Sequence, residues 1–321
     1  MQSFELLSEK FALNFERSHF PAEPSSLYLP NEYFLNLGGK RIRPVLCLMG
    51  NELFDEINPD AWHVATAIEL FHNFTLIHDD IMDKAPLRRG KETVHARFGE
   101  STALLAGDVM LVAAYEYLNK INASYIHSIV SLFNKTAREV CEGQQLDMDF
   151  EKKDEVSLQE YLQMIELKTS VLLAACLKLG SILGGASQRN QSLLYEFGKK
   201  LGIAFQVQDD YLDAFGDPSK FGKQQGGDIK SNKKTFLLVQ ALAISNDSQK
   251  KELKKLLRQN DERKTEKVLQ LFQDCKVNEW ALELKNKYLD EALAHLEDVA
   301  VLSKRKEPLM ELAHFLIQRE H

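Results

Sequence analysis

The sequence has few of the features that mark secreted, membrane-spanning or nucleic-acid-binding proteins. Its four cysteines, Cys47, Cys141, Cys176 and Cys275, lie far apart and form no Cys-x-x-Cys pair. Scattered thiols of this kind fit a reducing cytoplasm, where each is expected to be a small buried hydrophobe. A formal net charge of −7, with no basic stripe, argues against nucleic acid as a partner. An anionic ligand would therefore need locally placed lysines and arginines.

Long hydrophobic runs are also missing. The most apolar stretch, Ser170–Ala186, is interrupted by Lys178 and ends near a pair of glycines, so it is too short and too polar to span a bilayer. The first segment, Met1–Phe15, carries charged residues among its apolar ones and has no signal-peptide core. These observations predict a cytoplasmic protein that is not an integral membrane protein.

Helical periodicity runs through nearly the whole sequence. Apolar residues recur every three or four positions, and no run alternates as a half-buried strand would, so an all-α fold is expected. A chain of 321 residues could hold two domains, yet no linker divides this one, and a large helical bundle can be a single domain. We therefore expect one helical-bundle domain over residues 1–321.

Local start and stop signals place several helices. Asn58-Pro59 predicts a helix that starts there and runs to about Asp83, because Asn caps a helix and Pro fits its first position. Ser157 is expected to cap a helix over about 158–183. Pro30 is expected to keep its segment out of helix.

A cluster of three carboxylates closes the helix that starts at Pro59. Asp79, Asp80 and Asp83 lie within one stretch of five residues, and Asp79 and Asp83 share a helix face. Like charges there repel each other, and carboxylates at a helix C-terminus oppose its dipole, so a cation is expected between them. His72 and Thr75 extend the same face toward the N-terminus.

A second cluster, Asp209, Asp210 and Asp213, repeats the spacing at the end of another apolar helix, with Gln206 on the same face. Helical bundles build carboxylate metal sites from side chains on facing helices. Oxygen ligands without His or Cys favour a hard cation, and Mg²⁺ with substrate phosphates is the usual case. For either cluster alone, a solvated acidic helix end is the plain alternative.

Cationic residues lie near both clusters in the sequence. Lys40 and Arg43, after a paired glycine, are about one helical turn apart and could grip a diphosphate. Lys168 lies with Thr169 in an otherwise apolar helix, where a lysine is costly unless it is paired or lines a cavity. Each piece alone could be a solvated basic turn. The other candidates are Arg88 and Arg89 in the loop after the first cluster, and Lys223 and Lys233 in the glycine-rich loop after the second.

Taken together, these segments make the sequence similar to the trans-isoprenyl diphosphate synthases, also called polyprenyl synthetases. The matching segments, in family order, are Gly38-Gly-Lys-Arg-Ile-Arg-Pro44, Leu76-Ile-His-Asp-Asp-Ile-Met-Asp83, Arg88-Arg-Gly90, Lys168-Thr169, Phe205-Gln-Val-Gln-Asp-Asp-Tyr-Leu-Asp213, Gly222-Lys223, Gly227-Asp228 and Asn232-Lys233. They span the expected catalytic region, residues 38–233. No single segment is decisive, but the ordered set is specific.

The resemblance implies the isoprenoid synthase fold, a helical bundle around a deep central cavity, usually as a homodimer. It implies head-to-tail condensation of isopentenyl diphosphate with an allylic diphosphate (dimethylallyl, geranyl or farnesyl), with release of pyrophosphate. About three magnesium ions would hold the allylic diphosphate. The ligands it implies are Asp79, Asp83 and Asp209, with Asp80, Asp210 and Asp213 as further or water-mediated ligands.

The same resemblance divides the cationic and polar side chains between the two substrates. Those implied for the allylic diphosphate are Arg88, Lys168, Lys223 and Lys233. Those implied for isopentenyl diphosphate are Lys40, Arg43, His72 and Arg89. Oxygen dipoles of Thr169 and Gln206 would stabilise the allylic carbocation, and pyrophosphate itself would remove the final proton.

The length of the product is expected to depend on the helix that carries the first cluster. The growing chain would run from Asp79 back along this helix, so Thr75 and Phe71, four and eight positions earlier, share its face. Phe74, five positions earlier, would wall the pocket from the side. In the family an aromatic residue there is associated with short products, so C15 is expected first and C20 next. Both phenylalanines could instead be plain core residues.

Two other functions are compatible with parts of this pattern. A class I terpene cyclase shares the fold and the first cluster, but usually replaces the second with an Asn/Ser/Glu-type motif and needs no second diphosphate site. A non-catalytic subunit of a heteromeric synthase would have eroded aspartates. All six aspartates are present here, with Lys40 and Arg43, so prenyl transfer is the preferred prediction.

Overall fold

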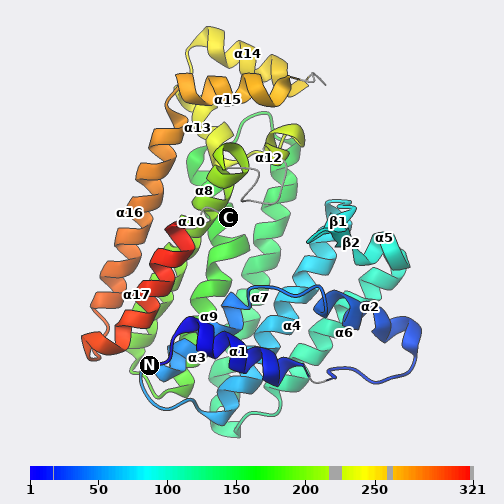
Figure 1. Cartoon of the computed structure of the whole chain (residues 1–321), viewed down its shortest axis with the longest axis vertical. Helices are drawn as coiled ribbons and strands as arrows, with labels where there is room; N and C mark the ends of the chain where they lie inside the picture. The colour runs from blue at the N-terminus through cyan, green and yellow to red at the C-terminus, as the bar shows by residue number, and fades with distance from the viewer. Residues whose placement is uncertain (17, 217–225, 259–262, 319–321) are drawn as a thin grey trace. The chain divides into compact units, whose positions relative to one another are not determined.

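The computed structural model describes residues 1–16, 18–216, 226–258 and 263–318, and within these ranges the chain is almost entirely helical (Figure 1). Apart from α-helices, the regular elements in these ranges are one π-helical turn and one pair of two-residue strands. The all-α expectation is therefore confirmed. In chain order the elements are α1 (Phe4–Phe15), α2 (Ser25–Leu35), α3 (Ile42–Glu52), α4 (Pro59–Met82), β1 (Leu87–Arg88), β2 (Lys91–Glu92), α5 (Val94–Phe98), α6 (Glu100–Leu118), α7 (Ala123–Lys152), α8 (Leu158–Ile165), η1 (Glu166–Ser170), α9 (Val171–Leu183), α10 (Gln188–Phe215), α12 (Gly227–Lys230), α13 (Phe236–Ile244), α14 (Asp247–Arg258), α15 (Lys264–Asp274), α16 (Val277–Glu297) and α17 (Ser303–Gln318).

The chain forms two compact units, each assembled from segments that are separated in the sequence. Unit 1 consists of Met1–Lys135, Ala175–Leu194 and Ala300–Pro308. Unit 2 consists of Thr136–Ala174, Tyr195–Val299 and Leu309–His321. The first aspartate cluster belongs to unit 1 and the second to unit 2.

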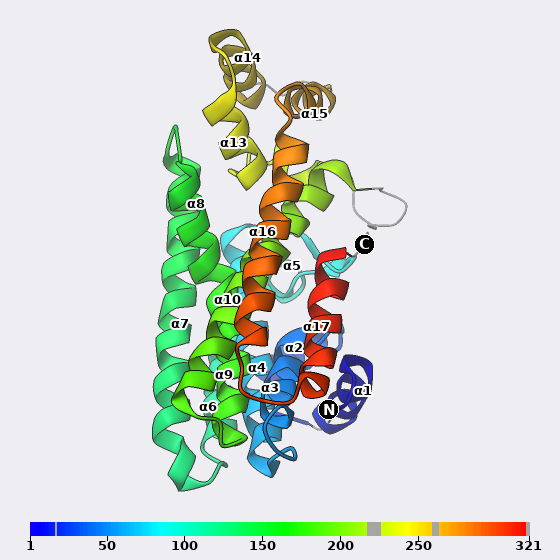
Figure 2. The ribbon, with the colours of Figure 1, turned by 90° about the vertical axis from the view of Figure 1, so that its left-hand side faces the viewer.

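Unit 1 is built around α4. This helix begins as expected, because the Asn58 side chain accepts a hydrogen bond from the backbone N–H of Asp60 and Pro59 occupies the first turn. It ends at Met82, with Asp83 as its C-cap. Helix α6 packs along it, and α3 packs against it as well (Figure 1). Helix α1 lies against α3 at the N-terminal end of the chain (Figure 2).

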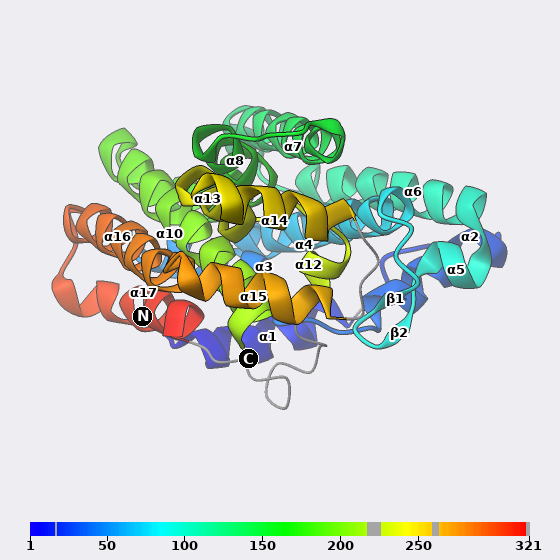
Figure 3. The ribbon, with the colours of Figure 1, turned by 90° about the horizontal axis from the view of Figure 1, so that it is seen from above.

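Unit 2 has a separate hydrophobic core. Buried residues of α10, α13, α15 and α16 pack together, with Phe236 and Val277 among the fully buried ones. Helices α14 and α15 lie side by side beyond α13 (Figure 3). None of the helices in the described ranges is both long and apolar enough to cross a membrane.

Several local expectations were wrong. Pro30 lies inside α2 rather than outside a helix. The proline lacks a backbone N–H, so the carbonyl of Ser26, four residues earlier, has no helical donor. Ser26 is exposed, and water can bind this carbonyl instead. The proline ring itself is buried. Cys141 is exposed and Cys275 only partly buried, so neither is a buried hydrophobe.

The helix expected over 158–183 is present but interrupted. Ser157 caps it in a full capping box with Glu160, as expected. At Glu166–Ser170 the hydrogen bonding changes to that of a π-helix, and α9 continues from Val171. Such turns are rare and are frequent at functional sites.

Candidate active site

The paired glycines at the start of α3 set up a cationic loop in unit 1. Gly38, Gly39 and Arg41 all have positive φ values of 78°, 155° and 50°. This left-handed path is easy for glycine and uncommon for arginine. Arg41 is the N-cap of α3, Lys40 precedes it on the exposed side of the loop, and Arg43 lies in the first turn.

Arg43 is bound to His72 across the α3–α4 contact. A guanidinium N–H of Arg43 donates to Nε2 of His72 at 3.0 Å. Since arginine only donates, Nε2 accepts and the imidazole proton lies on Nδ1. Burial, followed by the charges of Arg43 and Arg89, lowers the pKa of His72 well below its ordinary value, so the ring is neutral.

The Nε of Arg43 is a second hydrogen-bond donor, and it is not used by His72. This Nε is buried and has no hydrogen-bond partner among the described residues. Burial also lowers the pKa of this guanidinium, but from a value so high that it stays charged. A partly buried cation with a buried, unsatisfied donor is the chemical complement of a phosphate oxygen.

The loop after α4 brings two more arginines to the same unit. Strands β1 and β2 pair as a hairpin, with Arg88 opposite Lys91. The turn residues Arg89 and Gly90 have φ values of 53° and 74°, as a two-residue hairpin turn requires. The guanidinium of Arg89 packs on Gly39, where an added Cβ would lie 3.1 Å from its Nη2. A side chain at position 39 would therefore force the guanidinium of Arg89 to shift by a few tenths of an ångström.

The three aspartates of the first cluster have different surroundings. Asp80 is buried, with 2% of its side chain exposed. Its two carboxylate oxygens accept hydrogen bonds from Nε and Nη2 of Arg88 at 2.8 and 2.7 Å. Asp79 is half-buried on α4, and Asp83 is exposed at the C-cap. The middle aspartate therefore orients Arg88, while the other two lie nearer to solvent.

The second cluster, in unit 2, repeats this division. Asp210 is buried and accepts hydrogen bonds from the hydroxyl of Tyr161 at 2.7 Å and from Nε2 of Gln206 at 3.0 Å. Burial, and then the charge of Asp228, raises its pKa to about 6, although Lys233 acts in the opposite direction. Asp209 and Asp213 are half-buried.

Asp213 also anchors the turn that leads into α12. Its side chain accepts a hydrogen bond from the backbone N–H of Asp228 at 3.0 Å, and its carbonyl accepts one from Gly226 at 2.7 Å. Lys233 follows this short helix, and its effect on Asp210 shows that it lies near the second cluster. The predicted ligand Lys223 lies outside the described residues.

The π-helical turn η1 carries Lys168 and Thr169. Lys168 donates to Asp147 of α7 at 2.6 Å, so the costly lysine in an apolar helix is paired. Gly143 of α7 makes this approach possible, because a Cβ there would lie 2.3 Å from the backbone nitrogen of Lys168. The hydroxyl of Thr169 donates to Oε1 of Gln206 at 3.3 Å. Thr169, Gln206 and the second cluster thus form one polar network in unit 2.

The residues expected to gauge product length lie on α4 as expected. Phe71 is buried, and its ring packs 5.2 Å from that of Phe133 on α7. Phe74 is only partly buried and lies 4.7 Å from the ring of His78. Thr75 bonds the backbone carbonyl of His72. Phe71 therefore has the contacts of a core residue, and Phe74 is the less enclosed of the two.

Sequence reasoning missed five polar residues that contact the site residues or lie beside them. Two of them, Glu69 and Asn73, form a buried network with Arg41 in unit 1. The carboxylate of Glu69 interrupts an apolar run of α4, and a buried carboxylate needs a partner, so its sequence context did hold a signal. Asp147 gave no such signal, because its partner Lys168 is 21 positions away. The missed residues are Arg41, Glu69, Asn73, Asp147 and Tyr161.

The structure groups the predicted residues by unit. Unit 1 brings Arg43, His72 and Arg89 together, and unit 2 brings Thr169, Gln206 and Asp210 together. Among the described residues, His, Cys, Asp and Glu form no group of three or more that could hold a metal ion by itself. Mg²⁺ sites usually combine one or two carboxylates with substrate phosphates, so this donor set suits a metal that arrives with a diphosphate.

Comparison with known proteins places this chemistry in a family. A sequence model of the polyprenyl synthetase family matches residues 24–275. The chain belongs to the polyprenyl synthetases. A short chain isoprenyl diphosphate synthase of Methanothermobacter thermautotrophicus is 37% identical over 93% of this chain and 92% of that protein. A geranylgeranyl pyrophosphate synthase of Geoglobus acetivorans is 40% identical over 93% and 92%.

Solved structures agree on this polyprenyl synthetase fold. A crystal structure of a geranylgeranyl pyrophosphate synthase is 42% identical, has a TM-score of 0.95 and covers 100% of both chains. The isoprenoid synthase fold expected from the sequence is therefore confirmed, and prenyl chain elongation is the activity class of the family.

Proposed function

We propose that this polyprenyl synthetase condenses isopentenyl diphosphate head to tail with an allylic diphosphate, in a magnesium-dependent reaction that releases pyrophosphate. The observation that carries the proposal is the Arg43–His72 pair. It combines a partly buried guanidinium, a buried Nε donor without a partner among the described residues, and a neutral imidazole next to Arg89. This arrangement suits the binding of a diphosphate by charge. It does not require His72 to donate a proton in the reaction.

The proposal assigns the cationic residues to two diphosphates. Arg88 and Lys168, each held by an aspartate, would neutralise the allylic diphosphate together with Lys233 and Lys223. Pre-oriented charges of this kind need little rearrangement when the leaving group departs. The proposed ligands of isopentenyl diphosphate are Lys40, Arg43, His72 and Arg89.

The proposed metal ligands are three of the four aspartates with the more accessible side chains. Asp79, Asp83 and Asp209 would hold about three magnesium ions together with the allylic diphosphate. Bound Mg²⁺ neutralises charge on the departing pyrophosphate. Asp80 and Asp210, with their oxygens occupied by protein donors, would act through the residues that they orient, and Asp213 through the turn at Asp228.

The chemistry follows from charge. The allylic C–O bond breaks, pyrophosphate takes the electron pair, and Arg88 and Lys168 stabilise its charge. Oxygen dipoles of Thr169 and Gln206 stabilise the allylic cation. The electrons of the isopentenyl double bond then form the new C–C bond, which leaves a cation on the isopentenyl unit. The released pyrophosphate accepts a proton from the neighbouring carbon, and the product double bond forms. No side chain is proposed as general base.

We propose a C20 product and place C15 second. The expectation from sequence had the reverse order, and it rested on the aromatic Phe74. The relatives named above favour C20, since two of the three are geranylgeranyl synthases and the third is a short-chain synthase. We also propose that the chain acts as a single catalytic domain in the cytoplasm.

A homodimer is proposed on the basis of helix α6. Leu105, Val112 and Tyr115 are 55%, 58% and 39% exposed and lie on one face of this helix. An exposed apolar row of this kind commonly marks a protein interface. Sedimentation velocity at micromolar concentration would give the mass of the particle in solution.

The activity is tested by incubating the purified protein with radiolabelled isopentenyl diphosphate, Mg²⁺ and each allylic starter, and sizing the products. We expect label in a C20 chain, and none when EDTA is added. A cyclic hydrocarbon formed from the allylic diphosphate alone would indicate a terpene cyclase. No incorporation with any starter would indicate a non-catalytic subunit, and either result would overturn the proposal.

Product length has its own test. Phe74→Ala and Phe71→Ala are each expected to lengthen the product, with the larger effect at Phe74 because its ring is less enclosed by core residues. Phe34→Ala in α2 is the matched control, since it removes a fully buried ring elsewhere in unit 1. Chromatography of the dephosphorylated products gives the lengths. Unchanged products in both variants would exclude a role for these two rings.

A further inference from the structure

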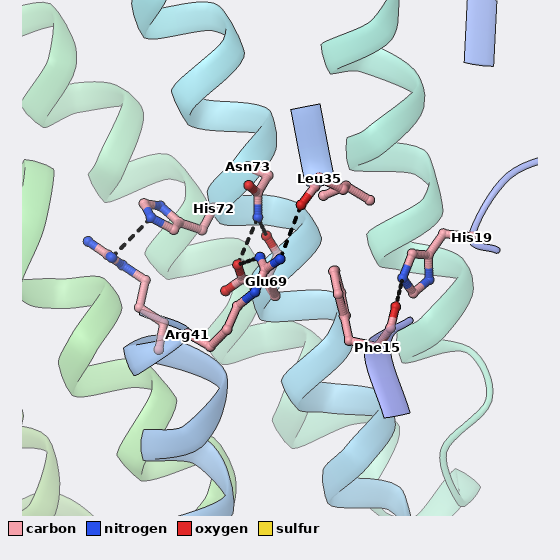
Figure 4. Close-up of polar contacts among 8 residues, drawn as sticks. Phe15, His19, Leu35, Arg41, Glu69, His72 and Asn73 are labelled. Carbon is pink, nitrogen blue, oxygen red and sulfur yellow. Dashed lines mark hydrogen bonds and ion pairs between the residues drawn. The ribbon is translucent and has the colours of Figure 1, made fainter. Parts of the chain in front are cut away.

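Arg41 lies between two proposed isopentenyl diphosphate ligands in sequence, yet its own side chain is turned into the protein (Figure 4). Its Nη1 pairs with Oε1 of Glu69, and its Nη2 donates to the backbone carbonyl of Leu35 at 3.2 Å. Its guanidinium also covers the ring of Phe15, 4.9 Å from the ring centre. With 12% of its side chain exposed, Arg41 is committed to protein contacts.

Glu69 is the centre of this network. Its side chain is 5% exposed, and its Oε1 also accepts a hydrogen bond from Nδ2 of Asn73 at 3.0 Å. Asn73 is buried one helical turn further along α4 and bonds the backbone carbonyl of Glu69 as well. A buried carboxylate with two side-chain donors of this kind has a fixed orientation.

Packing alone does not hold the loop that contains Arg41. A cavity of about 450 Å³ borders it, lined by Phe15, His19, Phe20, Gly38 and Arg41 together with other residues of α1 and α2. A Cβ added at Gly38 would meet no atom within 4 Å. The polar bonds of Arg41 to α4 and to Leu35 therefore help to hold its left-handed backbone, together with the contact of Arg89 on Gly39.

One face of α4 contacts both arginines of the loop. Glu69, His72 and Asn73 are at positions i, i+3 and i+4 and share that face. Glu69 pairs with Arg41 and is itself bonded by Asn73 (Figure 4). His72 binds Arg43. Lys40 directly precedes Arg41. The same helix face thus sets the positions of the cations on either side of Arg41.

We propose that Glu69, acting through Arg41 and supported by Asn73, is a positioning residue for the isopentenyl diphosphate subsite. It fixes the loop in the conformation in which Lys40 and Arg43 bind one diphosphate. This inference rests on the proposed function, since it concerns the affinity of that substrate. A misplacement of about 1 Å at such a site can cost on the order of 100-fold.

The test measures steady-state kinetics of Glu69→Gln with each substrate varied in turn. We expect the KM for isopentenyl diphosphate to rise about 10- to 100-fold. The kcat and the KM for the allylic diphosphate should change less than about twofold, because no allylic ligand belongs to the network. Glu69→Asp, which keeps the charge, should restore part of the affinity.

Two further variants separate positioning from folding. Arg41→Met/Glu69→Met replaces the ion pair by apolar side chains, an exchange that folded proteins often tolerate, and should show the same rise in KM. Thr66→Val is the matched control on α4. It removes a buried side-chain hydrogen bond to the carbonyl of Trp62, and it should lower the melting temperature without changing either KM.

The outcomes distinguish this inference from the function on which it rests. Wild-type turnover tests the proposed function, and the ratio of variant to wild-type KM tests the role of Glu69. Calorimetric titration of isopentenyl diphosphate gives the same ratio without turnover. An active wild type with unchanged affinity in Glu69→Gln and in the double methionine variant would reduce the network to a structural one and overturn the inference.

Discussion

Substitution of the middle aspartate of the first cluster should damage folding before it damages metal binding. In Asp80→Asn the side chain keeps one acceptor oxygen, but an amide N–H₂ then faces the guanidinium of Arg88. The pair loses one of its two charge-assisted hydrogen bonds, at 2.8 and 2.7 Å, and all of its ionic attraction. Arg88 is left as a partly buried cation without its counter-charge.

The expected size follows from the burial of the pair. Removing one partner of a buried ion pair typically costs about 3–5 kcal/mol. Arg88 keeps 26% of its side chain exposed, so water can replace part of the interaction and the lower end applies, about 3 kcal/mol. At about 2–4 °C per kcal/mol for a unit of this size, the melting temperature should fall by about 6–12 °C.

Asp83→Asn is the matched control, because it is the same substitution three residues later. Asp83 is exposed at the C-cap of α4, where removal of a negative charge relieves repulsion with the helix dipole by about 0.3–1 kcal/mol. Its melting temperature should stay the same or rise slightly. As a proposed metal ligand, it should instead need more Mg²⁺ for half-maximal activity.

Differential scanning calorimetry without Mg²⁺, followed by activity against Mg²⁺ concentration, separates these effects. We expect Asp80→Asn to shift the melting temperature and Asp83→Asn to shift the Mg²⁺ dependence. A stable Asp80→Asn with a strongly increased Mg²⁺ requirement would show that Asp80 is a direct ligand. The assignment of Arg88 orientation to this residue would then be wrong.

Two other predictions concern close contacts and pH. Gly143→Ala should lower the free energy of unfolding, measured by urea denaturation, by about 1–3 kcal/mol, because the new Cβ displaces the backbone at Lys168. It should also raise the KM for the allylic diphosphate. An unchanged free energy of unfolding would contradict the close approach. The lowered pKa of His72 means that the unfolded chain binds its proton more readily, so stability should fall as pH drops below about 6.5. His72→Gln should reduce that slope between pH 7.5 and 5.5, and an unchanged slope would refute a neutral buried ring.

Much of the fold could be read from the sequence because its signals are local. The cap at Asn58-Pro59 and the capping box at Ser157 depend on residues within one turn, and both were confirmed. The β1–β2 hairpin was missed because two-residue strands carry no alternation. The π-turn at η1, whose backbone passes close to Gly143 of another helix, was also missed.

Helical arithmetic was sufficient to separate the members of each aspartate cluster, but not to assign their partners. Asp79 and Asp83 share a face, and Asp80 is rotated about 100° away from Asp79. The sequence does not show what lies on that other face. In unit 1 it is Arg88, eight positions later, and for Asp210 in unit 2 it is Tyr161, 49 positions earlier. Partners at such separations depend on the tertiary fold.

The charges around His72 have a consequence for the free protein. Burial and then the charges of four arginines lower the pKa of this ring, and among the described residues two of the four, Arg41 and Arg88, pair with buried carboxylates, Glu69 and Asp80. The surroundings of His72 therefore hold more positive than negative side-chain charge, and this local repulsion lowers the stability of the free protein until an anion binds. A bound diphosphate would neutralise this excess positive charge. Substrate binding and folding are therefore linked, and the protein with substrate bound should be more stable to unfolding than the free protein.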